Sequence, residues 1–202
     1  MRAMTKPDRR ATIRSGSRGD GLSAPAAAAL VAGAVALTAI VSKRYSPTPD
    51  HPDIERWYRS LEKPGFTPPD PVIGAGWGVA ETLLAAGGYR LMRLPSSPGR
   101  NVALALWALN FATIVGWARL FFGERDLDGS LADIAVELGA AAGYVAVAAR
   151  VDGTAAALGV PYAAWAAFGG ALNEEIWRRN RGDGAGTAGA RTRGSNLPAL
   201  AH

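Results

Sequence analysis

Five apolar runs of near-spanning length constrain the fold of this chain more than any other feature. They cover residues 22–41, 72–92, 102–122, 131–151 and 154–177. A helix needs about 20 apolar residues to cross the hydrocarbon core of a bilayer, since each residue advances it by about 1.5 Å. Polar turn segments separate the runs. We therefore predict an all-α fold, an integral membrane bundle of five transmembrane helices.

The two ends of the chain differ from this core. Residues 1–21 are basic and rich in Gly and Ser, and residues 181–202 return to low-complexity polar sequence. Such segments bury too little apolar surface to fold, so we expect disordered tails on a transmembrane domain of residues 22–180. A cleaved signal peptide is the competing interpretation of the first run, which is longer than the apolar region of most such peptides.

Composition excludes several classes of site. The chain has no cysteine and two histidines, His51 and His202. Disulfides, thiol catalysis and Cys-ligated metals are therefore excluded, and we expect no metal site. The formal charge of +5 raises nucleic acid as a partner. Because the basic residues flank the apolar runs and do not gather on one helix, we expect contact with membrane lipid and no nucleic acid.

A polar stretch between the first two runs is unusually rich in aromatic residues and prolines. It reads WYRSLEKPGFTPP, from Trp57 to Pro69. Proline at this density fixes the backbone, whereas most loops carry small polar residues. The pattern indicates a loop that is held in one shape.

The last run carries an aromatic stripe. In VPYAAWAAFGGALNEEIWRRN, one stripe at three- and four-residue spacing holds Tyr162, Trp165, Gly169, Leu172 and Ile176, flanked by Phe168 and Asn173. This spacing places side chains on one face of a helix. An aromatic face with an amide is typical of a pocket wall or of a tight contact with a neighbouring helix, and the pattern leaves both interpretations open.

Two long motifs and two short ones give the chain a resemblance to a known family. The first long motif is Trp57, Tyr58, Leu61, Lys63, Pro64, Phe66, Pro68 and Pro69. The second is Pro161, Tyr162, Trp165, Phe168, Leu172, Asn173, Trp177 and Asn180. The short ones are Trp77 and the segment WARLFFG that begins at Trp117. In this order, from about residue 25 to 180, the chain resembles the TspO/MBR family of tryptophan-rich sensory and translocator proteins, the peripheral benzodiazepine receptor type.

The resemblance implies a homodimer of five-helix bundles with a pocket between the helices. It implies planar hydrophobic ligands, above all tetrapyrroles such as protoporphyrin or haem, bound as ligands with no separate cofactor. The implied ligand-binding residues are Trp77, Trp117, Tyr162, Trp165, Phe168 and Asn173. Indole and phenyl faces stack on a flat macrocycle, and an amide can bond its polar edge.

The same resemblance makes the proline-rich stretch a lid over the pocket mouth. Its residues are Trp57, Tyr58, Lys63, Pro64, Phe66, Pro68 and Pro69. We expect Trp57 and Tyr58 to anchor this lid, the prolines to stiffen it, and Phe66 to face inwards. Gly139 and Gly143, spaced as GxxxG, fit either packing inside the bundle or a dimer face.

Three places depart from the family pattern. Ile114 stands where an asparagine is usual, and Glu81 replaces a tyrosine one turn after Trp77. Glu174 and Glu175 replace the tyrosine of a sterol-associated segment, which weakens the case for a sterol ligand.

Two carboxylates lie inside predicted spans, Glu81 and Glu137. A carboxylate in a membrane is costly unless it is protonated, paired or facing a cavity. We add Glu81 to the ligand-binding residues because it shares a helix face with Trp77. The alternative is a structural role, either as an ion pair with Arg90 or Arg119 or as a buried neutral acid, and Glu137 fits that structural role better.

The apolar runs predict a multi-pass membrane protein, and the resemblance implies that it lies in a bacterial plasma membrane and binds or senses a planar hydrophobic ligand. A light-dependent porphyrin-degrading enzyme is an alternative, in which tryptophans near a bound pigment supply or quench radicals. A porphyrin or sterol transporter is a third. No catalytic pair is placed by the sequence, and five spans without evident inverted repeats do not favour a transporter.

Overall fold

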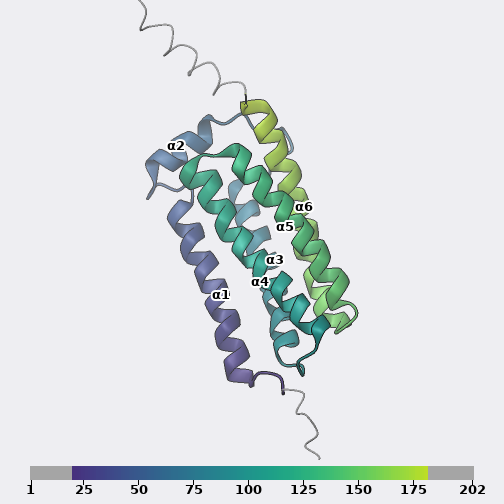
Figure 1. The fold of residues 1–202 in the computed structure, drawn as a ribbon. Helices are drawn as coiled ribbons and strands as arrows, with labels where there is room; N and C mark the ends of the chain where they lie inside the picture. The colour runs from purple at the N-terminus through teal and green to yellow at the C-terminus, as the bar shows by residue number, and fades with distance from the viewer. Residues whose placement is uncertain (1–19, 182–202) are drawn as a thin grey trace, which may run out of the picture.

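A computed structural model describes residues 20–181, in which five long helices form a bundle (Figure 1). The long helices are α1 (Ala24–Tyr45), α3 (Asp70–Met92), α4 (Pro98–Ala118), α5 (Leu127–Ala148) and α6 (Gly153–Asn180). The remaining described elements are the short helix α2 (Pro52–Ser60) and the π-helical segment η1 (Arg119–Glu124). The all-α class is confirmed. The predicted tails lie outside the described residues, apart from residues 20, 21 and 181.

Four of the long helices begin with a side chain that caps the first turn. Each cap accepts a hydrogen bond from a backbone N–H three residues further on, and the caps are Ser23, Ser97, Asp126 and Asp152. Such bonds satisfy N–H groups that have no partner inside the helix. The predicted runs include only apolar residues, so they leave out these polar first turns. The helices α4 and α5 therefore each begin four residues earlier than predicted.

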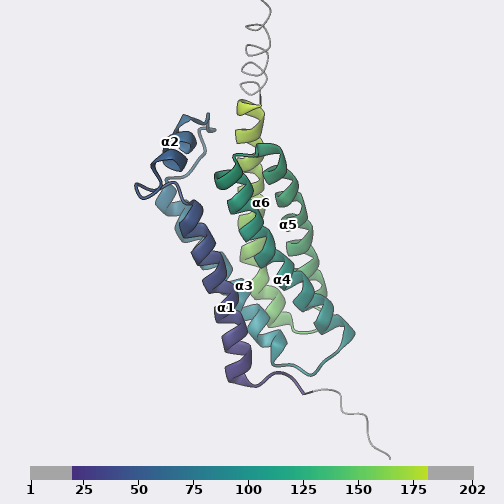
Figure 2. The same cartoon turned by 60° about the vertical axis from the view of Figure 1, so that its left-hand side comes forward.

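Four helices in the described region are long and apolar enough to cross a membrane: α1, α4 continued by η1, α5 and α6. The helix α3 is 23 residues long but less apolar, because several glycines and Glu81 interrupt its apolar residues. It packs between α1 and α6 and runs the length of the bundle (Figures 1 and 2). Five long helices therefore share one bundle.

The helices pack in an order that differs from their order in the chain. The helix α1 contacts α3 and α4, α3 contacts α6, α6 contacts α5, and α5 contacts α4. These contacts close a ring in the order α1, α3, α6, α5, α4. Successive long helices run in opposite directions, so that α1, α4 and α6 end where α3 and α5 begin, beside α2 (Figures 1 and 2). All five helices can therefore contribute side chains to a site at that end.

Close contacts inside the ring depend on glycines that face large side chains. Tyr144 is fully buried between Gly87 on α3 and Gly159 on α6. A Cβ atom at either glycine would collide with the Tyr144 side chain. The Tyr144 hydroxyl donates to the carbonyl of Ala155 at 3.1 Å. Because helices in lipid gain little from leaving water, such close fits hold the bundle together.

The two glycines of the GxxxG pattern on α5 have different surroundings. A Cβ atom at Gly143 would lie 3.3 Å from the Leu106 side chain, whereas one at Gly139 would meet no atom within 4 Å. Gly143 therefore serves the α4–α5 contact, which is packing inside the bundle. Gly139 lies on an open face, and the dimer interpretation stays a prediction.

The stretch predicted as a loop is partly helical. Trp57 and Tyr58 lie on α2, which begins at Pro52. Proline suits the first turn of a helix because its φ is already helical and its missing N–H would have no partner there. The interpretation of residues 57–69 as a loop is therefore wrong for residues 57–60. This nine-residue helix carries no apolar run, which is why the pattern missed it.

Candidate ligand-binding site

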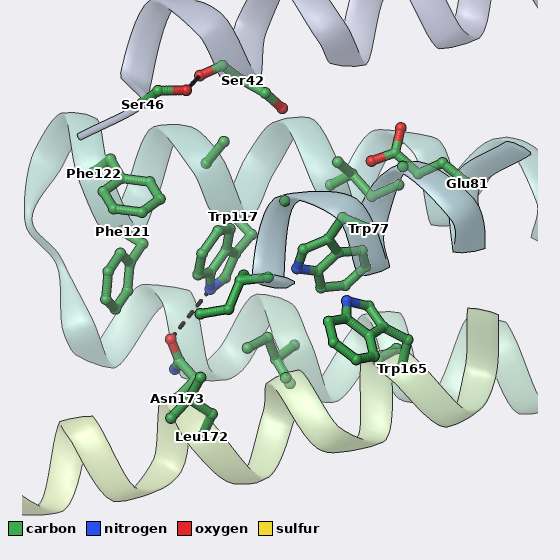
Figure 3. Close-up of a pocket in the computed structure, with 18 of the residues that line it drawn as sticks. Ser42, Ser46, Trp77, Glu81, Trp117, Phe121, Phe122, Trp165, Leu172 and Asn173 are labelled. Atoms are coloured by element: carbon green, nitrogen blue, oxygen red, sulfur yellow. Dashed lines mark hydrogen bonds between the residues drawn. The ribbon is translucent and has the colours of Figure 1, made fainter. Parts of the chain in front are cut away.

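A pocket of about 570 Å³ lies between the helices (Figure 3). Tyr58 of α2 is among its lining residues. All five long helices and η1 contribute lining residues, and most of these are apolar or aromatic. The volume falls within the range of about 300–1,000 Å³ that is usual for small-molecule sites. The ring of helices therefore encloses a site of ligand size.

Three of the predicted tryptophans line this pocket (Figure 3). Trp77 lies on α3, Trp165 on α6 and Trp117 on α4. Trp165 of α6 packs against Gly76 of α3, and Trp77 of α3 packs against Gly169 of α6, so that the two helices interlock. A side chain at Gly76 would collide with the Trp165 ring, so this glycine makes room for an indole in the pocket wall.

Trp117 is held by a hydrogen bond and by ring packing. Its Nε1 donates to Asn173 Oδ1 at 3.2 Å, and its ring stacks on Phe121 with 4.9 Å between centroids (Figure 3). The Nδ2 of Asn173 donates in turn to Ser130 Oγ at 3.4 Å. Asn173 lines the pocket as predicted, and its amide also orients the Trp117 indole.

Phe168 also lines the pocket, whereas Tyr162 does not. Tyr162 is fully buried, and its hydroxyl donates to Glu137 Oε1 at 2.6 Å. Its ring packs edge-on against Trp77, with 6.1 Å between centroids. Tyr162 therefore lies behind the pocket wall and supports the residues that face the cavity.

Glu81 and Glu137 both line the pocket, and neither forms the ion pair considered from the sequence. Arg90 and Arg119 instead bind carboxylates near their own helix ends, at 3.0 and 2.8 Å. The ion-pair interpretation is therefore wrong for these arginines. Glu81 Oε2 accepts a hydrogen bond from the Thr38 hydroxyl of α1 at 2.9 Å.

Sequence reasoning missed the contribution of α1 to the pocket. Ser42 and Ser46 bring hydroxyl groups from the end of this helix, and Thr48 follows them (Figure 3). The α1 sequence is apolar on nearly every face, so no period indicates which side turns inwards. Ile114, at one of the departures from the family pattern, also lines the pocket and puts an apolar surface there.

The helix α2 is anchored on η1 by aromatic rings. Trp57 packs edge-on against Phe121 at 5.4 Å between centroids, and Tyr58 packs edge-on against Phe122 at 5.5 Å. Tyr58 also lines the pocket. These contacts place α2 beside η1, next to the pocket.

A polar cluster of Tyr58, Lys63 and Asp70 lies at the pocket mouth. The Tyr58 hydroxyl donates to Asp70 Oδ1 at 3.4 Å, and Lys63 Nζ donates to the Tyr58 carbonyl oxygen. Burial, assisted by the negative charge of Asp70, raises the pKa of Tyr58 to about 12. Burial lowers the pKa of Lys63, and Asp70 opposes that shift. Tyr58 therefore stays a neutral hydrogen-bond donor at physiological pH.

Phe66 lies in a turn beside the pocket and packs edge-to-face with the lining residue Phe168. The N–H of Thr67 donates to the Pro64 carbonyl at 3.0 Å, which closes a turn with Gly65 and Phe66 at its corners. Phe66 is 52% exposed, and only its ring edge approaches Phe168, at 6.4 Å between centroids. Phe66 is not among the residues that line the pocket, and an inward-facing role for it stays a prediction.

The model of the TspO/MBR family matches residues 25–178. The chain belongs to the TspO/MBR family. It is 35% identical over 129 residues to the human translocator protein, which covers 63% of this chain and 76% of the human one. It is 31% identical over 126 residues to a tryptophan-rich sensory protein of Cereibacter sphaeroides, covering 62% and 78%. Protein CrtK of Rhodobacter capsulatus is 30% identical over 128 residues, covering 63% and 80%.

The predicted resemblance is thereby confirmed, and the chain is a multi-pass integral membrane protein. The family match covers the helix ring, α2 and the whole pocket lining, from Val35 to Ile176. Asn180 lies just beyond it and belongs to the second long motif.

In this TspO/MBR protein, Asn180 binds the backbone of Glu62, in the segment predicted to form a lid. Its Oδ1 accepts a hydrogen bond from the N–H of Glu62, and its Nδ2 donates to the carbonyl of Glu62, both at 3.0 Å. These two bonds clamp the segment before Pro64 to the end of α6. The clamp is independent of the aromatic contacts that hold α2.

We expect Asn180→Ala to loosen this segment. Two neutral hydrogen bonds contribute roughly 1–3 kcal/mol together, so local opening should become roughly 5- to 150-fold more frequent. Hydrogen–deuterium exchange of residues 61–67 in nanodiscs measures this opening. Glu62→Ala is the matched control, because the clamp uses only the backbone of Glu62. Unchanged exchange in Asn180→Ala, or equal acceleration in the control, would contradict the clamp.

Proposed function

We propose that this TspO/MBR protein binds or senses planar hydrophobic ligands in a bacterial plasma membrane, with tetrapyrroles such as protoporphyrin and haem as its main ligands. The observation that carries the proposal is the pocket of about 570 Å³ lined by three indole side chains. Indole faces stack on flat aromatic surfaces, and a tetrapyrrole presents a large one.

The surroundings of the pocket support a defined ligand orientation. The macrocycle packs against Trp77 and Trp165. Among residues 20–181, no Lys, Arg or His lines the pocket, and Lys63 lies at its mouth beside Tyr58. A porphyrin therefore keeps its carboxylates at the mouth, near Lys63, where water and a positive charge are available.

Relatives support two kinds of role. A relative named tryptophan-rich sensory protein favours ligand sensing, and relatives named translocator protein keep transport as an alternative. Three indoles around one cavity also favour the alternative of light-dependent breakdown of a bound pigment. Family membership supports a homodimer as the assembled form.

A protoporphyrin titration in nanodiscs tests the proposal. In the dark, saturable quenching of tryptophan fluorescence is expected. Trp77→Phe and Trp165→Phe should each weaken affinity roughly two- to tenfold, because a smaller ring loses part of the stacking energy. Trp177→Phe is the control, since Trp177 does not line the pocket.

The outcome under light separates binding from catalysis. Loss of pigment absorbance with the native protein, and not with the two pocket variants, would favour the enzyme. Stable pigment with saturable quenching favours binding or sensing. No quenching by folded protein contradicts the tetrapyrrole proposal.

A further inference from the structure

Two carboxyl groups lie deep in the pocket. Glu81 and Glu137 are each about 15 Å along their helices from Asp70 and Leu127, at ~1.5 Å per residue. This depth is about half of the ~30 Å hydrocarbon core. Glu137 is only 3% exposed, yet it lines the cavity together with Glu81. Both groups therefore face a ligand that reaches the floor of the pocket.

Each of these carboxyl groups uses only one oxygen in bonds to the protein. Glu81 Oε2 accepts a hydrogen bond from the Thr38 hydroxyl, and Glu137 Oε1 accepts one from the Tyr162 hydroxyl. The Thr38 hydroxyl also lies 2.9 Å from the carbonyl of Val35, and its single hydrogen can serve one acceptor at a time. Within residues 20–181, nothing donates a hydrogen bond to Glu81 Oε1 or Glu137 Oε2. These oxygens remain available to a ligand.

The pocket has acidic residues and no basic ones in the described part of the chain. Its lining includes Asp70, Glu81 and Glu137, and no Lys, Arg or His. Asp70 lies at the mouth, where its negative charge acts to raise the pKa of the nearby Lys63. The two deeper carboxyl groups have no such partner. A negative charge at this depth is costly unless a cation or water compensates it.

We infer that Glu81 and Glu137 form a subsite for a protonated nitrogen at the floor of the pocket, so that among flat aromatic ligands whose substituent reaches this floor the pocket prefers a cationic nitrogen over a neutral or anionic group. The inference rests on the proposed function, because the aromatic part of the ligand must bind the indole wall. A cation supplies the counter-charge that the protein lacks, and charge-assisted hydrogen bonds to carboxylates are strong. The indole faces of Trp77 and Trp165 add cation–π attraction.

Three probes with the same fused three-ring skeleton test this preference. They are 9-aminoacridine, a cation at neutral pH, 9-methylanthracene, which is neutral, and anthracene-9-carboxylate. Quenching of tryptophan fluorescence is measured in nanodiscs of zwitterionic lipid, with empty nanodiscs to correct for partitioning into lipid. Protoporphyrin is titrated alongside. We expect the native protein to bind the cation about tenfold more tightly than the neutral probe.

Two isosteric variants locate the subsite. Glu81→Gln and Glu137→Gln keep the bonds to Thr38 and Tyr162 and remove the negative charge. Each should lose about threefold in affinity for 9-aminoacridine, and the double variant about tenfold, while all keep their affinity for 9-methylanthracene, which also reports an intact pocket. Asp70→Asn is the control. This acidic residue lies at the mouth, so its substitution should leave the preference for 9-aminoacridine over 9-methylanthracene unchanged.

The outcomes separate this inference from the proposed function. Equal affinity for the three probes, or a cation preference that survives in the Glu81→Gln, Glu137→Gln double variant, overturns the cation subsite. Saturable quenching by protoporphyrin in that same experiment leaves the proposed function standing. If folded native protein binds none of the probes and no protoporphyrin, both fail.

Discussion

Gly76→Ala should weaken protoporphyrin binding by at least about tenfold while the bundle stays folded. A Cβ atom at Gly76 would occupy the space of the Trp165 ring. Because Trp165 borders the cavity, its ring can move into the pocket, where it takes the space and the stacking surface of the ligand. The added methyl group is therefore accommodated by a shift of the Trp165 side chain, which weakens protoporphyrin binding while α3 and α6 stay packed together.

Gly33→Ala is the matched control for this prediction. It makes the same chemical change in a long helix, at a position where a Cβ atom meets nothing within 4 Å. Fluorescence titration gives both affinities, and size-exclusion chromatography shows whether each variant is folded. Native affinity in Gly76→Ala, or an equal loss in Gly33→Ala, would contradict the role of Gly76 in making room for Trp165.

Tyr144→Ala should lower the free energy of unfolding by about 3–5 kcal/mol, the usual cost of removing a large buried aromatic ring. Tyr144 is fully enclosed between Gly87 and Gly159, so the truncation leaves a void that rigid helices cannot refill. It also removes the hydrogen bond to the Ala155 carbonyl. Unfolding monitored by tryptophan fluorescence in mixed micelles measures the loss.

Tyr144→Phe separates the ring from its hydroxyl. This variant keeps the packing and loses only the bond to Ala155, so it should cost about 0.5–1.5 kcal/mol. A similar loss in both variants would mean that the hydroxyl, and not the ring, holds α3, α5 and α6 together.

Much of the candidate site follows from local spacing in the sequence. Trp165, Phe168 and Asn173 recur on one helix face, and all three line the pocket. Tyr162 has the same spacing but lies behind the wall, against Glu137. Helical periodicity predicts the direction in which a side chain points, and it does not predict where along the helix the cavity ends.

Other features depend on distances between helices and were not predictable. The apolar pattern places Glu81 inside a span, and it cannot show that Thr38 of α1 lies beside it. The proline-rich motif indicates a rigid segment, and it does not show the turn at Gly65 and Phe66 or the bonds from Asn180 to Glu62. These contacts join residues far apart in the chain.

The sequence alone determined the membrane class, the long helices and the family, because apolar length and motif spacing are local properties of the chain. Only the tertiary structure decided the ring order, which makes α3 a neighbour of α6 and α1 a neighbour of α4. That order follows from the fit of large rings against glycines on other helices, such as Trp165 on Gly76. It closes the pocket around two carboxyl groups, Glu81 and Glu137, that have no basic partner among the lining residues of the described chain.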